Sequence, residues 1–139
     1  MHHLAYLKFL LIHKYFVLLE GRKLGLPWWQ LLRHDWSKFL PDEWFTGVAY
    51  HRDGTSNTDT LAKHYQRNRH HPQYWVKGEA ISSMPTRFCL EMIADWRAIG
   101  RVKGTSTAEW YTEYGAKFPF HPETRAKVES ILFEAIKPE

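Results

Sequence analysis

The spacing of apolar residues constrains the fold of this chain more than any other feature. Over residues 3–21, apolar side chains recur at steps of three and four, namely Leu4, Leu7, Leu11, Tyr15, Leu18 and Leu19. That spacing puts them on one face of an α-helix. A half-buried strand needs an apolar residue at every second position, and no stretch of the sequence shows this alternation. The sequence therefore predicts an all-α fold.

Proline, glycine and polar loops mark the breaks between the predicted helices. Pro27 can begin a second helix that reads PWWQLLRHDWSKF, residues 27–39. Further helices are predicted over residues 41–51, 58–69, 86–101 and 122–136. One stripe of the helix over residues 86–101 carries Phe88, Met92, Asp95 and Ile99. The length of 139 residues suits one domain, and no repeat or linker divides it. We expect a single compact helical domain over residues 1–139, with about five to seven helices.

Composition and charge limit the compartment and the classes of ligand. The single cysteine, Cys89, excludes an internal disulfide and suits a reducing cytosol, and its apolar helical surroundings predict a buried thiol. Lys8, His13 and Lys14 interrupt the apolar N-terminal segment, so a membrane span is not expected. The formal charge of +4 permits an anionic ligand, but the basic residues form no stripe, which disfavours nucleic acid. We expect a cytoplasmic protein that binds a small anionic molecule.

Four polar residues interrupt helix faces that are otherwise apolar. They are His13, His34, Asp35 and Asp95. A buried polar group without a partner costs about 1–3 kcal/mol, and a lone carboxylate costs more. Each residue has an ordinary explanation on its own, such as a hydrogen-bonded core histidine or an ion pair from Asp95 to Arg97 or Arg101. Their order over three predicted helices instead favours one divalent metal ion shared by all four.

The donor types fit several divalent metals. Imidazoles and carboxylates together suit Zn, Mn, Fe, Co, Ni or Mg, so the sequence does not select one of them. With four protein ligands, an octahedral ion keeps positions for water and for a phosphate oxygen. Such an ion lowers the pKa of its water and neutralises charge on a phosphoryl group. We expect one bound ion, and a second histidine cluster leaves room for another.

The order His13, His34-Asp35, Asp95 resembles the HD-domain superfamily of metal-dependent phosphohydrolases, which are all-helical. More narrowly, the segments HDWSKF, HYQRNRHHPQYW and EMIADWRA look like a small family of phage and bacterial HD-like proteins. The resemblance covers residues 5–100. It implies that these four residues bind the metal.

A second polar cluster lies in KHYQRNRHHPQYW, where a continued helix would place His64, Asn68 and His71 on one face. The cyclic-nucleotide phosphodiesterase and HD-GYP branches of the superfamily carry two extra histidines in this region. The similarity implies that His64 and His70, or His71 in its place, bind a second metal, although the chain lacks the GYP tripeptide. The alternative assigns substrate phosphate binding to the donors of this segment, namely Arg67, Asn68, Arg69 and His71. A solvated loop is the third interpretation.

Two charged residues near the His-Asp pair are candidates for catalysis together with Asp35. Lys38 lies about one helical turn after Asp35, on the same side, where it could stabilise phosphate charge or donate a proton. Glu43 falls where HD proteins that hydrolyse deoxynucleoside monophosphates carry their second acid. Lys38 replaces the first acid of that branch, so the resemblance does not select the monophosphate reaction.

These features together predict a hydrolase that uses metal-activated water to cleave a phosphoester or phosphoanhydride of a small-molecule nucleotide. A two-metal phosphodiesterase acting on cyclic or oligonucleotide signals is the first alternative. A helical nucleotide-binding protein without catalysis is the second. Seven tryptophans are many for this length, and we expect most of them to pack helices together. Exposed ones would make a homodimer unsurprising.

Overall fold

The all-α prediction is confirmed by the computed structural model, which describes residues 1–133. This part of the chain forms seven α-helices: α1 (His2–Lys23), α2 (Trp28–Leu32), α3 (Pro41–Asp53), α4 (Thr58–Arg67), α5 (Thr86–Lys103), α6 (Thr107–Tyr114) and α7 (Pro122–Phe133). It also contains three 3₁₀ helices: η1 (Trp36–Phe39), η2 (Pro72–Trp75) and η3 (Gly115–Lys117). A single antiparallel hairpin pairs β1 (Val76–Lys77) with β2 (Ala80–Ile81). The hairpin was not predicted, because strands of two residues are too short to show alternation.

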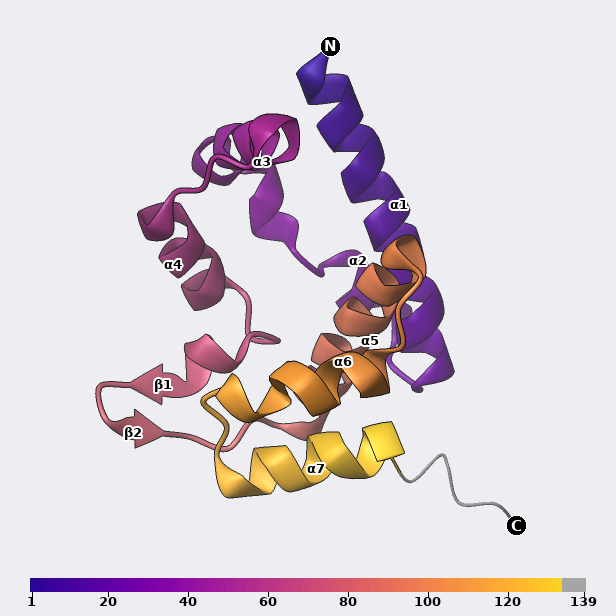
Figure 1. The fold of residues 1–139 in the computed structure, drawn as a ribbon, viewed down its shortest axis with the longest axis vertical. Coiled ribbons are helices and arrows are strands. Elements are labelled where there is room, and N and C mark those ends of the chain that lie inside the picture. The colour runs from indigo at the N-terminus through magenta and orange to yellow at the C-terminus, as the bar shows by residue number, and fades with distance from the viewer. Residues whose placement is uncertain (134–139) are drawn as a thin grey trace.

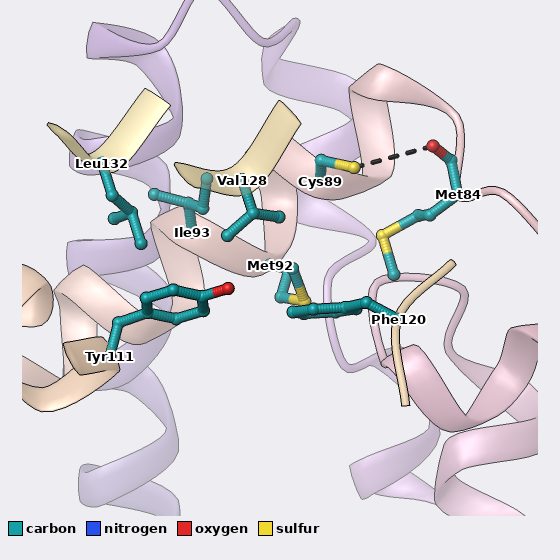
Figure 2. Close-up of a cluster of buried hydrophobic side chains, with 8 residues drawn as sticks. All are labelled: Met84, Cys89, Met92, Ile93, Tyr111, Phe120, Val128 and Leu132. Carbon is teal, nitrogen blue, oxygen red and sulfur yellow. Dashed lines mark hydrogen bonds between the residues drawn. The ribbon is translucent and has the colours of Figure 1, made fainter. Parts of the chain in front are cut away.

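Helices α1 and α5 pack side by side and form the most extensive helix pair of the fold (Figure 1). The largest apolar cluster joins α5 to α6 and α7 (Figure 2), and it consists of Met84, Cys89, Met92, Ile93, Tyr111, Phe120, Val128 and Leu132. A second cluster joins α1, α2 and α5 through Val17, Leu26, Leu31 and Ala98. A third joins α1 to α3 through Tyr6, Leu10 and Val48. The expected burial of the Cys89 thiol is confirmed.

The buried face of α1 is not the predicted stripe. Three of the six predicted positions are exposed, namely Leu4, Leu11 and Tyr15. The inward face carries Tyr6, Leu10, His13, Val17 and Glu20. His13 lies on that face because it contacts Asp95 of α5. Glu20 lies there because it pairs with Arg101. The prediction chose the wrong face because α1 carries apolar residues on every side. The buried face is instead identified by two polar residues that have partners on α5, His13 and Glu20.

The predicted helix over residues 27–39 is interrupted in its middle. Helix α2 ends at Leu32, and η1 begins at Trp36. Between them, Asp35 has a φ angle of 53°, in the left-handed region that aspartate tolerates better than most residues. The Lys14 ammonium donates to the carbonyls of Leu32 and His34, at 3.1 and 2.7 Å. These carbonyls have no partner within α2, so Lys14 stabilises the turn that replaces a continued helix.

Smaller differences from the prediction concern helix ends. Helix α4 ends at Arg67, two residues early, and the chain then continues in extended conformation at Asn68. Ile99 of α5 is exposed rather than part of the buried stripe. The predicted last helix is confirmed to Phe133, and its expected residues 134–136 lie outside the described part of the chain. Among the described helices, none has the length and apolar character that crossing a bilayer requires.

The tryptophans divide between packing and exposure. Trp75, Trp96 and Trp110 pack against the largest apolar cluster, in agreement with the expected use of these side chains. Trp28, Trp29 and Trp36 are exposed near the His34-Asp35 turn. The homodimer stays a prediction.

The ion pair between the buried Glu20 of α1 and the exposed Arg101 of α5 gives a test of this helix contact. Burial raises the pKa of the Glu20 carboxyl, but hydrogen bonds and charges from Arg101 and Lys23 lower it further, so it lies below its ordinary 4.5. We expect Glu20→Gln to reduce the free energy of unfolding by about 1–2 kcal/mol at pH 7. A lowered folded-state pKa gives stability that is present above pH 4.5 and lost as the pH falls below it. Urea unfolding at pH 7 and pH 3 should therefore show the difference between wild type and variant shrinking in acid.

Candidate metal centre

The four predicted metal ligands meet in the interior of the fold. His13 comes from α1, His34 and Asp35 from the turn before η1, and Asp95 from α5. The Nε2 atom of His13 lies 2.9 Å from Oδ1 of Asp95. The Nε2 atom of His34 lies 3.5 Å from Asp35 Oδ2 and 3.6 Å from Asp95 Oδ1. All four residues are buried. The alternative ion pair from Asp95 to Arg101 does not form, because Arg101 pairs with Glu20.

A third imidazole joins this group from the segment after α4. The Nε2 atom of His70 lies 3.2 Å from Asp35 Oδ1 and 3.8 Å from Asp95 Oδ2. The rings of His34 and His70 are neighbours, with centroids 4.2 Å apart. Three imidazoles and two carboxylates, all buried, therefore share one small space. We call this set, His13, His34, His70, Asp35 and Asp95, the histidine–aspartate cluster.

Most of the cluster's inward atoms have no hydrogen-bond partner. Among residues 1–133, five buried side-chain nitrogen or oxygen atoms lack such a partner. Four of the five belong to the cluster: Nε2 of His13, His34 and His70, and Oδ1 of Asp35. The close approach of His13 to Asp95 does not have the geometry of a hydrogen bond. Buried polar atoms normally have hydrogen-bond partners. Three imidazole nitrogens and one carboxylate oxygen that lack partners and lie close together therefore fit the ligands of a single cation.

In His34 and His70, the second ring nitrogen, Nδ1, already contacts a carboxylate. Glu91 of α5 places Oε1 at 3.0 Å from His34 Nδ1 and at 3.3 Å from His70 Nδ1. Histidines that bind metals commonly hold a carboxylate at their second ring nitrogen. The three atoms around Glu91 are also close enough to hold an ion. They are satisfied by one another, whereas the Nε2 atoms are not, so a cation would have its open ligands on the Nε2 side.

Charge in this region favours a bound cation. The buried carboxylates near the cluster are Asp35, Glu43, Glu91 and Asp95, and the cationic side chains paired with them are Lys38 and Arg67. Burial lowers the pKa of His34, but the negative charges of Asp35 and Asp95 and the contact with Glu91 raise it to about 10. A raised pKa for a buried histidine indicates a strongly negative electrostatic potential at its ring. A divalent cation would supply the charge that a proton on His34 otherwise supplies.

A second possible metal group adjoins the first and shares Asp35. The Nε2 atoms of His64 and His71 lie 2.9 Å apart, and His64 Nε2 is 3.5 Å from Asp35 Oδ1. Asp35, His64 and His71 are close enough to hold an ion together. The sequence left open whether His70 or His71 accompanies His64. The structure places His71 beside His64 and His70 in the histidine–aspartate cluster.

The two predicted catalytic neighbours lie on different sides of the centre. The Lys38 ammonium is 2.6 Å from Asp35 Oδ2, and its side chain is 26% exposed, so it lies between the cluster and solvent. Glu43 lies behind His64, with Oε2 at 2.7 Å from His64 Nδ1 and also accepting from Ser37 Oγ. Its other oxygen accepts from Arg67 at 2.7 Å. Glu43 therefore orients His64 and has partners at both carboxylate oxygens, and its catalytic role stays a prediction.

Of the four residues predicted to bind substrate phosphate, only His71 lies at the centre. The Arg67 guanidinium is held by Asp42 and Glu43. The Asn68 amide donates to Ser37 Oγ at 2.7 Å and to the His64 carbonyl at 2.9 Å. Arg69 is exposed and lies over the rings of Tyr74 and Phe88. Internal partners thus occupy Arg67 and Asn68. In the turn that follows Asn68, Arg69 is exposed whereas His70 is buried.

Comparison with protein families identifies the chain's relatives. One family model matches residues 2–134, which is almost the whole sequence. The chain belongs to DUF5662. This family is described as one of unknown function. Comparison with curated proteins and with solved structures gives no match. The DUF5662 match includes every residue of the histidine–aspartate cluster.

One residue of this DUF5662 chain that completes the centre was missed by the sequence analysis. Glu91 stands four positions before Asp95, so both carboxylates lie on the same face of α5. That spacing in a segment otherwise suited to the core was a usable signal. The partner Gln30, which donates to Glu91 at 2.7 Å, gave no such signal, because the contact depends on how α2 packs against α5.

Proposed function

We propose that the protein is a metal-dependent hydrolase that cleaves a phosphoester or phosphoanhydride bond of a nucleotide. The observation that carries the proposal is the set of four buried, unsatisfied donor atoms that three separate parts of the fold bring together. The resemblance of His13, His34-Asp35 and Asp95 to the HD-domain pattern supports the same reaction class. The formal charge of +4 is compatible with an anionic substrate.

The residues that would hold the cation are His13, His34, Asp35 and Asp95, with His70 beside them. A divalent cation held there supplies Lewis acidity, which neutralises phosphoryl charge and makes water a better nucleophile at neutral pH. The Glu91 carboxylate contacts the other ring nitrogen, Nδ1, of both His34 and His70. The chain's contribution is thus a fixed, buried set of donors.

Lys38 is the residue placed to meet the substrate. Its ammonium group is partly exposed and in contact with Asp35, so an arriving phosphate can gain a positive partner at the edge of the centre. In the hydrolysis, a bond forms between phosphorus and the oxygen of water. The bond from phosphorus to the leaving oxygen breaks, and that oxygen takes up a proton. Lys38 would stabilise the negative charge on the phosphoryl oxygens during this exchange.

A two-metal phosphodiesterase is the second candidate, and one observation favours it. Asp35 presents Oδ2 to His34 and Oδ1 to His64 and His70, so a single carboxylate adjoins both possible metal groups. Carboxylates that bridge two ions about 3.5–4 Å apart are typical of two-metal hydrolases. Two ions would suit cyclic or oligonucleotide substrates, as the HD-GYP similarity implies.

Elemental analysis of protein purified without a histidine tag, followed by a nucleotide hydrolysis panel, tests the proposal. We expect at least one equivalent of a divalent metal per chain and release of phosphate or of a shorter nucleotide. Two equivalents together with phosphodiester cleavage would select the second candidate. Binding of nucleotides without turnover across Zn, Mn, Fe, Co, Ni and Mg would replace both with a nucleotide-binding protein.

A further inference from the structure

The buried Glu91 carboxylate lies outside the histidine–aspartate cluster and contacts two of its imidazoles, those of His34 and His70. We infer that Glu91 is a positioning residue that fixes His34 and His70 together, so that both rings turn Nε2 toward one cation. The inference rests on the metal centre of the proposed function. It concerns how the chain builds that centre and not which bond the enzyme cleaves.

The carboxylate is fixed at both of its oxygens. On one side, Oε1 lies 3.0 Å from His34 Nδ1 and 3.3 Å from His70 Nδ1. On the other side, Oε2 accepts from Gln30 Nε2 at 2.7 Å. The same amide nitrogen of Gln30 donates to the Arg87 carbonyl at 3.2 Å, which ties it to the first turn of α5. Glu91 is 5% exposed, so no solvent replaces these contacts easily.

The shared acceptor explains the orientation of both rings. A neutral imidazole that donates from Nδ1 has its lone pair on Nε2, where a metal binds. One Glu91 oxygen lies close to Nδ1 of both His34 and His70 and, as a carboxylate oxygen, can only accept there, so one carboxylate sets the tautomer and the rotation of both rings. His34 belongs to the turn after α2, and His70 belongs to the segment after α4. Glu91 therefore links two segments that are far apart in the sequence.

An amide at position 91 cannot reproduce this arrangement. A glutamine offers one acceptor oxygen and a donor NH₂ group, and it already faces the donor amide of Gln30 on one side. With Glu91→Gln, either Gln30 or the two histidines lose their acceptor. We expect the loss to weaken both metal ligands together while the volume of the side chain stays unchanged.

Cobalt titration of the Glu91→Gln variant tests the inference. The probe is Co²⁺ alone, added to metal-free protein and followed by its visible absorption bands, with the Kd set by competition with a chelator. We expect the Kd to rise about 10–100-fold and the bands to change shape, since a histidine is reoriented. The matched control is Glu20→Gln, another buried glutamate of the α1–α5 region that pairs with Arg101 and not with the cluster. Its Kd and bands should stay as in wild type.

Two outcomes would overturn the inference. One is a Glu91→Gln protein, folded by circular dichroism, that binds Co²⁺ with the wild-type Kd and bands. The other is a wild-type protein that binds no Co²⁺, which would remove the proposed function as well. Wild-type binding without hydrolysis would leave the inference standing and remove only the proposed enzyme activity.

A second variant keeps the test decisive if Glu91→Gln does not fold. Gln30→Met removes the support of Oε2 and leaves the Glu91 carboxylate in place. We expect a smaller rise of the Co²⁺ Kd, about two- to tenfold, because one hydrogen bond to a charged group is lost. An unchanged Kd and unchanged cobalt bands in folded Gln30→Met protein would count against positioning through this carboxylate.

Discussion

Replacing Asp35 with asparagine is expected to abolish metal binding and phosphate release together. Asp35 contacts Lys38 at 2.6 Å and adjoins His34, His64 and His70 at 3.2–3.5 Å, so its charge serves both possible metal groups. Asparagine keeps the size of the side chain and tolerates the left-handed backbone of position 35. The effect should therefore come from the lost charge. We expect kcat/KM to fall by about 10³-fold or more, which corresponds to several kcal/mol of transition-state stabilisation.

His34→Ala should give the same double loss by removing a neutral donor. The measurement is metal content by elemental analysis together with the initial rate on the best nucleotide of the hydrolysis panel. His2→Ala and Asp53→Asn are matched controls, because both residues are exposed and neither contacts the centre. Full turnover in both Asp35→Asn and His34→Ala would remove the hydrolase proposal. So would equal losses in the two surface controls.

Most helices were predictable from the sequence, although α6 was not, and neither was the inner face of α1. Prolines and glycines near positions 27, 41, 54, 85, 104 and 122 mark helix ends that the structure confirms to within a few residues. In α1 the apolar residues surround the helix, so periodicity alone selected Leu4 and Leu11, which are exposed. His13 and Glu20 identify the inward face, but only once their partners Asp95 and Arg101 are known. Glu20 and Arg101 are 81 residues apart in the sequence, so their pairing depends on the tertiary structure and cannot be read from local periodicity.

In the candidate site, the sequence identified most of the residues but not the contacts that decide what each of them does. Buried polar residues in apolar surroundings pointed to His13, His34, Asp35 and Asp95, because such groups are costly without partners. The roles of Arg67 and Glu43 could not be assigned in this way. Their mutual ion pair and the contact of Glu43 with His64 arise from the packing of α3 against α4. A charged side chain with no evident partner in the sequence can have all its charged atoms bound to other residues in the folded protein.

Removing the proposed metal ion is expected to lower the melting temperature strongly. Without a cation, the buried carboxylates of Asp35 and Asp95 face three imidazole nitrogens whose hydrogen-bonding capacity is unmet. A cation bound to the folded state at a thousand times its Kd adds about 4 kcal/mol of stability. For a chain of this length, that corresponds to a rise of roughly 10–20 °C.

Thermal unfolding followed by circular dichroism, with chelator and then with excess Mn²⁺ or Co²⁺, measures this difference. His34→Ala should melt at one temperature in both conditions, since it lacks the centre. Glu20→Gln should start lower than wild type, because its helix contact is weakened, and should still show the full metal-dependent rise. A wild-type protein that binds one equivalent of metal but melts at the same temperature with and without it would place the ion outside the buried cluster. The donor atoms of His13, His34 and His70 would then need another explanation.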